Sequence, residues 1–222
     1  MRGRFITFEG GEGSGKSTQA KLLADRLRPF GIAVVLTREP GGSPGAEAVR
    51  HVLLSGAAQP LGAHAEAILF AAARDDHVSQ TIRPALDSGR WVISDRFADS
   101  TRIYQGTLGN VDTRLIARLE HITIADTRPD LTIILDVPVE VGLQRASWRR
   151  GQAAGDRFEA EDRDFHEKLR EAYQELAERD SERCVLIDGS ADPAAVGNAV
   201  WDVVKARLDP AEAPVHLEDA AS

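Results

Sequence analysis

Short apolar runs alternate along the chain with longer stretches that have the periodicity of an amphipathic helix. Five runs lack the polar alternation of half-exposed strands, which is typical of strands buried on both faces of a parallel sheet. They are Phe5 to Phe8, Ala33 to Thr37, Trp91 to Ser94, Leu131 to Val137 and Cys184 to Ile187. The periodicity between and after them predicts helices over Ser17 to Arg28, Ala46 to Leu54, His64 to Asp87, Thr113 to Ala125, Val139 to Arg150, Ala160 to Arg179 and Pro193 to Leu208. This alternation predicts an α/β fold.

One domain accounts for most of the chain. No internal repeat and no linker rich in proline and glycine separates two core-forming halves, so residues 1–208 are interpreted as a single unit. Pro84 is expected to kink or split its helix near residue 83. Residues 209–222 are acidic, interrupted by prolines and poor in apolar side chains, so we expect a disordered tail there.

Composition and charge exclude several classes of protein. The 222 residues are 42% apolar and 28% charged, as expected of one soluble globular domain. A net charge of −8 opposes a general attraction to nucleic acid or to an anionic membrane. No apolar run reaches the roughly 18 residues of a membrane-spanning helix. Glu9 and the glycines after it also interrupt any secretory signal, and the single cysteine, Cys184, fits a buried thiol in a reducing compartment. We therefore expect a cytoplasmic protein.

A phosphate-binding motif follows the first predicted strand. It matches G-x-x-x-x-G-K-[ST] and leads directly into a predicted helix, which is the context of a P-loop. The motif predicts an ATP-binding loop made of Gly10, Gly11, Glu12, Gly13, Ser14, Gly15, Lys16, Ser17 and Thr18. Lys16 would reach the β- and γ-phosphates as a catalytic residue, and the Ser17 hydroxyl would bind Mg²⁺. The alternative is a glycine-rich turn without a ligand.

The P-loop does not identify the reaction. No Asn-Lys-x-Asp segment, which would read a guanine base, occurs in the sequence, and this weakens the case for a GTPase. A kinase whose acceptor carries a phosphate needs a second phosphate pocket, for which arginine is the favoured residue. Candidate arginines lie at or near predicted strand ends and in one glycine-flanked loop, namely Arg38, Arg74, Arg96, Arg149, Arg150 and Arg157.

Several motifs in order make the chain resemble the bacterial thymidylate kinases from about residue 4 to residue 205. Besides the P-loop they are Thr37-Arg38-Glu39-Pro40-Gly41-Gly42, Leu69-Phe70-Ala71-Ala72-Ala73-Arg74, Asp95-Arg96-Phe97, Tyr104-Gln105-Gly106, Arg128-Pro129-Asp130-Leu131 and Asp156-Arg157-Phe158-Glu159. The resemblance implies transfer of the γ-phosphoryl group of ATP to dTMP, giving dTDP for dTTP biosynthesis, with Mg²⁺ as cofactor. It also implies a P-loop kinase fold with a five-stranded parallel sheet of order 2-3-1-4-5, and a homodimer that packs the helices at 46–54 and 64–87 across a two-fold axis.

The same resemblance assigns the substrate-binding residues. Phe70 would stack on thymine and Arg74 would bind the edge of the base, Arg96 would clamp the acceptor phosphate as a catalytic residue, and Asp95 would help to hold Mg²⁺. The remaining substrate-binding candidates are Glu12, Arg38, Pro40, Thr101, Tyr104 and Gln105. Four of these residues have a structural alternative: Phe70 as a core aromatic, Arg96 in a surface salt bridge, Asp95 with Arg96 as a structural ion pair, and Glu12 as a solvated acid.

The segment at about 148–158 resembles the lid that covers the phosphates in this family. Its arginines would supply the catalytic positive charge, with Arg149 and Arg150 favoured over Arg157, because Asp156 and Glu159 can pair with Arg157. Residues Gln152 to Gly155 make the spacer longer than the family pattern. Two alternatives stay open, namely a kinase for another nucleoside or nucleoside monophosphate, and a nucleotide-binding switch or regulatory ATPase.

Overall fold

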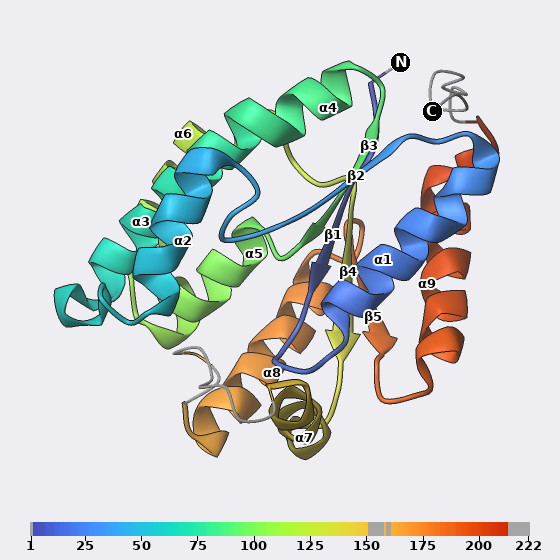
Figure 1. Cartoon of the computed structure of the whole chain (residues 1–222). Coiled ribbons are helices and arrows are strands. Elements are labelled where there is room, and N and C mark those ends of the chain that lie inside the picture. The colour runs from blue at the N-terminus through green and yellow to red at the C-terminus, as the bar shows by residue number, and fades with distance from the viewer. Residues whose placement is uncertain (1, 151–157, 159–160, 213–222) are drawn as a thin grey trace.

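A five-stranded parallel sheet forms the centre of the molecule (Figure 1). The computed structural model describes residues 2–150, 158 and 161–212, and the side chains of Arg150 and Glu212 lie outside the description. The strands are β1 (Phe5–Glu9), β2 (Val34–Arg38), β3 (Trp91–Asp95), β4 (Leu131–Asp136) and β5 (Cys184–Asp188). Their order is β2-β3-β1-β4-β5, and every neighbouring pair is parallel. The predicted fold class, sheet and strand order are therefore confirmed.

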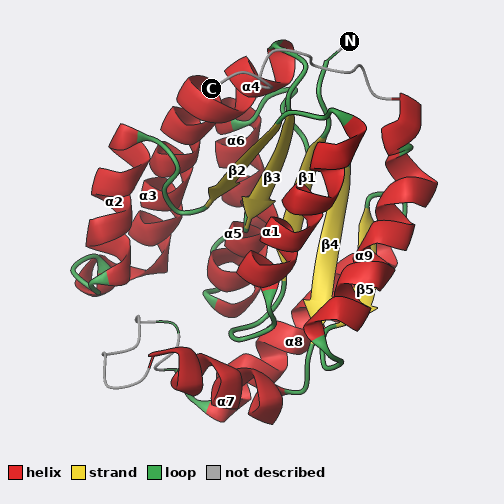
Figure 2. Cartoon of the chain, turned by 45° about the vertical axis from the view of Figure 1, so that its right-hand side comes forward, coloured by secondary structure: helices red, strands yellow, loops and turns green. Residues whose placement is uncertain are grey.

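Helices cover both faces of this sheet (Figure 2). The helices of the described part are α1 (Lys16–Leu27), α2 (Pro44–Leu54), α3 (Gly62–His77), α4 (Arg83–Asp87), α5 (Ala98–Thr101), α6 (Thr113–Thr123), α7 (Val139–Arg150), α8 (Arg163–Arg179) and α9 (Pro193–Leu208). One face packs against α1 and α9, whereas the other packs against α4 and α8. Helices α2 and α3 lie against each other, and α6 lies against α3.

Alternation of side chains along β1 divides the core between the two faces. Ile6 and Phe8 join the cluster that contains α1 and α9, whereas Phe5 joins the cluster that contains α4. The Phe5 ring meets the edge of the Phe97 ring at 4.9 Å between centroids, which anchors the segment after β3 to the sheet. Thr7 and Glu9 share the face of Phe5 because strand side chains alternate with a period of two.

A π-helical turn, Val78–Ile82, separates α3 from α4 inside the predicted helix at 64–87. The expected break near residue 83 is thus confirmed. Pro84 has no N–H to donate to a carbonyl one turn earlier, so the regular hydrogen-bond ladder is interrupted there. A second π-helical turn, Arg102–Leu108, continues α5 and was not predicted. Helix α8 begins at Arg163 rather than near 160, because the Asp162 side chain accepts a hydrogen bond from the Phe165 N–H.

The end of the described chain differs from the expectation of a tail from residue 209. Pro210–Glu212 form a short 3₁₀ turn in which Pro210 is buried, and the rest of the predicted tail, 213–222, lies outside the described residues. Among the helices of the described part, none is long and apolar enough to cross a bilayer.

Cys184 lies at the start of β5, 3% exposed, as predicted for a core thiol. Burial raises the pKa of this thiol to about 12, so the reactive thiolate is scarce at pH 8. We expect a thiol reagent to modify the native protein only as fast as it unfolds. Labelling rates with and without urea, followed by mass spectrometry, measure this. Native protein that reacts as fast as the unfolded chain would contradict the burial of Cys184.

Candidate active site

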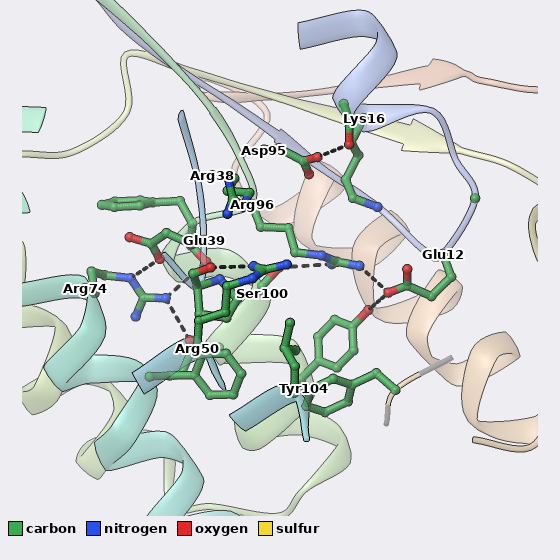
Figure 3. Close-up of a pocket in the computed structure, with 18 of the residues that line it drawn as sticks. Glu12, Lys16, Arg38, Glu39, Arg50, Arg74, Asp95, Arg96, Ser100 and Tyr104 are labelled. Atoms are coloured by element: carbon green, nitrogen blue, oxygen red, sulfur yellow. Dashed lines mark hydrogen bonds and ion pairs between the residues drawn. The ribbon is translucent and has the colours of Figure 1, made fainter. Parts of the chain in front are cut away.

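A cavity of about 360 Å³ opens at the carboxyl ends of the central strands (Figure 3). Its walls come from the P-loop, the segment after β2, helix α3, the end of β3 and the helical segment after it. The predicted residues that line it are Glu12, Gly13, Gly15, Lys16, Ser17, Thr18, Arg38, Pro40, Phe70, Arg74, Asp95, Arg96, Thr101, Tyr104, Gln105 and Arg149. Sites predicted from distant parts of the sequence therefore meet in one space.

Two glycines of the P-loop are required by close backbone approaches. Gly10 has φ 131°, and a Cβ there would lie 2.5 Å from the Leu135 carbonyl oxygen. Gly13 has φ 66°, and its Cβ would lie 1.9 Å from the carbonyl oxygen of Gly142 on α7. Both conformations disfavour other residues. Gly10, Gly11 and Ser14 do not line the main cavity but a smaller neighbouring one of about 30 Å³.

Lys16 folds back over the loop that carries it. Its Nζ donates to the carbonyl oxygens of Gly10 at 3.0 Å and Gly11 at 2.7 Å, and to Ser14 Oγ at 3.3 Å. Burial, with the nearby positive charge of Arg96, lowers the pKa of Lys16 to about 8. Helix α1 begins after Gly15 without a side-chain cap, so its first N–H groups face the loop as donors for an anion.

Arg96 joins the P-loop to the rest of the cavity. It has φ 70°, a conformation that costs on the order of 1–3 kcal/mol for a residue other than glycine. Its guanidinium forms an ion pair with Glu12 and lies 5.2 Å from the centre of the Tyr104 ring. A strained backbone that the surroundings hold in place is typical of functional sites. The alternative of a surface salt bridge is excluded, because the Arg96 side chain is only 16% exposed.

Glu12 is an ionised, enclosed carboxylate rather than a solvated loop acid. Burial alone would raise its pKa, but Arg96, Lys16 and a hydrogen bond donated by Tyr104 at 3.2 Å lower it to about 2. Its side chain is only 12% exposed. The carboxylate therefore contributes one fixed negative charge within a site whose other charged walls are mainly arginine and lysine.

Ser17 and Asp95 place two oxygen ligands at the mouth of the P-loop. The Ser17 hydroxyl donates a hydrogen bond to Asp95 Oδ2, and both residues line the cavity. No cluster of three or more histidine, cysteine or acidic residues suited to a metal occurs among the residues described. Hydroxyl and carboxylate oxygens are ligands that Mg²⁺ accepts while it keeps water and binds substrate phosphates, so this pair fits that ion.

Aromatic side chains line one part of the cavity. Phe70 on α3 is half-buried, and its ring centre lies 6.3 Å from that of Phe158. Tyr104 meets the edge of Phe158 at 5.2 Å. Phe70 thus lines an open pocket instead of the closed core, and flat apolar surfaces of this kind suit a nucleobase.

Arg74 lies one turn after Phe70 and is held by the protein. Its Nε donates to Glu39 Oε2 at 2.8 Å, and one terminal nitrogen donates to Thr101 Oγ1 at 2.9 Å. Arg74 is 2% exposed, and Glu39 also bonds His77 Nδ1 at 3.1 Å. This network joins α3 to the segment after β2 and to α5.

Replacing Arg74 with alanine is expected to lower the free energy of unfolding by about 3 kcal/mol, because it leaves the Glu39 carboxylate buried without its main partner. Urea denaturation measures the change. The matched control is Arg38→Ala, which removes an exposed pair with Glu47 and should cost less than about 1 kcal/mol. Equal losses in the two variants would contradict the importance of burial.

Two predicted catalytic residues cannot be placed. Arg157 and the side chain of Arg150 lie outside the described residues, as do residues 151–157 of the predicted lid. Arg149, at the end of α7, lines the cavity, and its charge contributes to the low pKa of Glu12.

Some lining residues were missed by the sequence analysis. Arg50 reaches into the cavity from α2 and donates to the Pro40 carbonyl oxygen, while Glu39 and Ser100 also line the wall. Glu9 does not line the cavity but supports its wall. Glu9 carried a signal that could have been used, since it is an acidic residue at the end of an apolar strand that is buried on both faces.

Residues 8–200 match the family model described as thymidylate kinase. The chain is 62% identical to a thymidylate kinase of Bradyrhizobium sp. (strain ORS 278) over 207 residues, which cover 93% of this chain and 92% of the relative. It is 61% identical to that of Nitrobacter winogradskyi over 213 residues, covering 96% and 93%. A crystal structure of thymidylate kinase from Ehrlichia chaffeensis superposes with a TM-score of 0.73 at 36% identity, covering 92% of this chain and 99% of the other.

Proposed function

Because this chain belongs to the thymidylate kinase family and transfers a phosphoryl group from ATP to dTMP, giving dTDP, we propose that the cavity of about 360 Å³ holds both nucleotides. Their phosphates would meet beside Arg96 and Glu12. The observation that supports this most strongly is the continuity of the cavity, which runs from Lys16 of the P-loop to Phe70 of the aromatic wall.

The P-loop side takes ATP in this proposal. Backbone N–H groups of the loop and the uncapped start of α1 bind the phosphates, and Lys16 exchanges its carbonyl partners for phosphate oxygens. Ser17 and Asp95 would hold Mg²⁺, which when bound neutralises charge on the donor phosphates.

The aromatic side takes dTMP. Phe70 stacks on thymine, while Arg74, Thr101 and Gln105 bind the base edge and Tyr104 packs beneath the deoxyribose. A tyrosine there leaves no space for a 2′-hydroxyl, so deoxyribose is favoured. Arg96 binds the acceptor phosphate. The Glu12 carboxylate faces the sugar 3′-hydroxyl or the metal ion instead of the donor phosphates. Arg38 and Pro40 complete the acceptor side.

Chemistry in this site is in-line phosphoryl transfer by positioning and by neutralisation of charge. Lys16 and Arg96 hold the two phosphate groups in one cavity. The negative charge of Glu12 offsets positive charge in the P-loop. Positive charge from Arg149 or Arg150 therefore completes the neutralisation of the phosphate oxygens in the transition state.

We also propose a cytoplasmic homodimer. Exposed apolar side chains occur on α2, α3 and α6, among them Val52, Ile68 and Ile122. Since α3 packs against both other helices, these positions belong to one helical layer suited to a two-fold interface. Light scattering after size-exclusion chromatography measures the mass of the assembly, and a monomer at micromolar concentration would contradict the dimer. The buried, unpaired Cys184 supports a reducing compartment.

A coupled assay of ADP release over a panel of acceptors tests the function. We expect turnover with ATP, Mg²⁺ and dTMP, less with dCMP, AMP and GMP, and none with thymidine, because thymidine lacks the phosphate that Arg96 binds. Loss of one hydrogen bond in the buried base site costs roughly 1–3 kcal/mol, or about 5- to 150-fold. Faster phosphorylation of AMP than of dTMP would contradict the proposal, and ATP hydrolysis independent of every acceptor would favour a regulatory ATPase.

A further inference from the structure

Glu9 is a fully buried carboxylate that ends β1 directly before the P-loop. It is 0% exposed and lies on the same face of the strand as Thr7. A buried charge is costly unless hydrogen bonds and opposite charges compensate it. The environment of Glu9 therefore requires an explanation that the substrate contacts do not supply, since Glu9 is not among the residues that line the cavity.

Four hydrogen bonds from described donors end on this carboxylate. Oε1 accepts from the backbone N–H of Phe97 at 2.8 Å and of Ser100 at 3.3 Å. Oε2 accepts from Ser100 Oγ at 2.7 Å and from the Tyr173 hydroxyl at 2.8 Å. These donors use the main acceptor positions of a carboxylate.

The bonds on Oε1 fix the backbone beside Arg96. The Phe97 N–H belongs to the peptide that follows Arg96, and Ser100 lies in the first turn of α5, which has no cap from its own preceding side chain. Glu9 takes the role of that cap from a different strand. It thereby holds the segment on which Arg96 adopts its positive φ of 70°.

The bonds on Oε2 reach the Arg96 side chain through two hydroxyl groups. Arg96 Nη1 donates to Ser100 Oγ at 3.2 Å and to the Tyr173 hydroxyl oxygen at 3.4 Å. Both hydroxyls in turn donate to Glu9. The negative charge of Glu9 is thus connected to the guanidinium by two short hydrogen-bonded paths.

Burial raises the pKa of Glu9 overall, and the four donors on its two oxygens are the groups that suit an ionised carboxylate. Burial and the nearby Asp99 raise the pKa of Glu9, whereas the positive charge of Arg96 and the hydrogen bonds from Ser100 and Phe97 oppose that rise. Arg96 is therefore one of the groups that stabilise Glu9 in its ionised form.

We infer that Glu9 is a positioning residue for Arg96, which it holds in the geometry that grips the phosphate of the acceptor nucleotide. This inference rests on the proposed role of Arg96 as the phosphate clamp. It predicts that a change at Glu9 weakens recognition of the acceptor phosphate more than recognition of the nucleoside part.

The Kd for thymidine divided by the Kd for dTMP isolates that effect, because the two ligands differ only in the phosphate. A lower ratio means weaker recognition of the phosphate. Isothermal titration calorimetry on the full chain provides both values. We expect Glu9→Gln, which keeps the shape and removes the charge, to lower the ratio by about tenfold, the size of one weakened hydrogen bond to a charged group. Thymidine binding itself should change by less than about twofold.

A matched control is available on the same strand. Thr7→Val changes a fully buried polar residue that faces the same side and bonds Thr132 at 2.7 Å, so it tests loss of stability without contact to Arg96. Its ratio should equal that of the wild type. Tyr173→Phe removes one of the two hydroxyl paths and should lower the ratio by about threefold. It keeps the inference testable if the Gln variant does not fold.

Arg96→Ala separates this inference from the proposed function. If it lowers the ratio while Glu9→Gln and Tyr173→Phe leave it unchanged, the positioning role is wrong and the clamp stands. If Arg96→Ala itself leaves the ratio unchanged, the proposed clamp is wrong. An equal fall in the ratio for Thr7→Val would show a general loss of structure and would also overturn the inference.

Discussion

Alanine in place of Arg149 or Arg150 is expected to lower kcat by about 10³-fold or more, with KM for ATP and dTMP little changed. The reason is electrostatic. Glu12 puts an ionised carboxylate with a pKa of about 2 into the P-loop. It lies where we propose that the donor and acceptor phosphates meet. Arg149 lines the same cavity and adds positive charge near Glu12. Charge that acts on the transition state more than on the bound substrates changes kcat rather than KM.

Single alanine variants of Arg149, Arg150 and Arg157, assayed under steady-state conditions, test this expectation. Arg163→Ala is the matched control, because Arg163 forms exposed ion pairs with Glu140 and Glu167 and does not line the cavity. If all three variants keep kcat within about threefold of the wild type, the catalytic charge must come from elsewhere, with Arg38 and Arg96 as the next candidates.

Lys16→Ala is expected to lower kcat by about 10²- to 10³-fold while leaving the Kd for dTMP within about threefold. We propose that Lys16 belongs to the donor side, and in the structure its Nζ donates to the carbonyl oxygens of Gly10 and Gly11. Removing it takes away the cation that we propose binds the donor phosphates, and it leaves Phe70 and Tyr104 unchanged.

Turnover and dTMP binding of this variant are compared with those of Lys21→Ala, an exposed substitution on the same helix. Turnover of Lys16→Ala equal to that of the wild type would contradict the assignment of the P-loop as the donor site. Loss of dTMP affinity as large as the loss of turnover would show that the two sites are not separate.

Much of the fold could be predicted because its signals are local. Strands buried on both faces appear as uninterrupted apolar runs, and β3, predicted over Trp91 to Ser94, is observed over Trp91–Asp95. The π-helical turn Arg102–Leu108 has no such local signal, because a π turn depends on the packing around it. The start of α8 was predicted near residue 160 but is observed at Arg163. The sequence has several acidic residues there that could cap the helix, and only the folded chain shows that Asp162 is the cap.

The candidate site could be predicted where one residue type has one strong role, as for Lys16 in its glycine loop. It could not be predicted where the role depends on a partner far along the chain. Tyr173 gives no sign in the sequence that it contacts Glu9, from which it is 164 residues distant. Arg74 was predicted to bind the base edge. In the structure its Nε donates to Glu39 and one terminal nitrogen donates to Thr101, and only the folded chain brings these two residues near.

A crystal structure with dTMP, Mg²⁺ and a non-hydrolysable ATP analogue tests most directly the claim that one cavity holds donor and acceptor together. We predict thymine against Phe70, the dTMP phosphate on Arg96, and the β- and γ-phosphates of the analogue on Lys16, with the two phosphate groups adjacent. Density for dTMP outside this cavity, or inside it with its phosphate turned away from Arg96, would contradict the account.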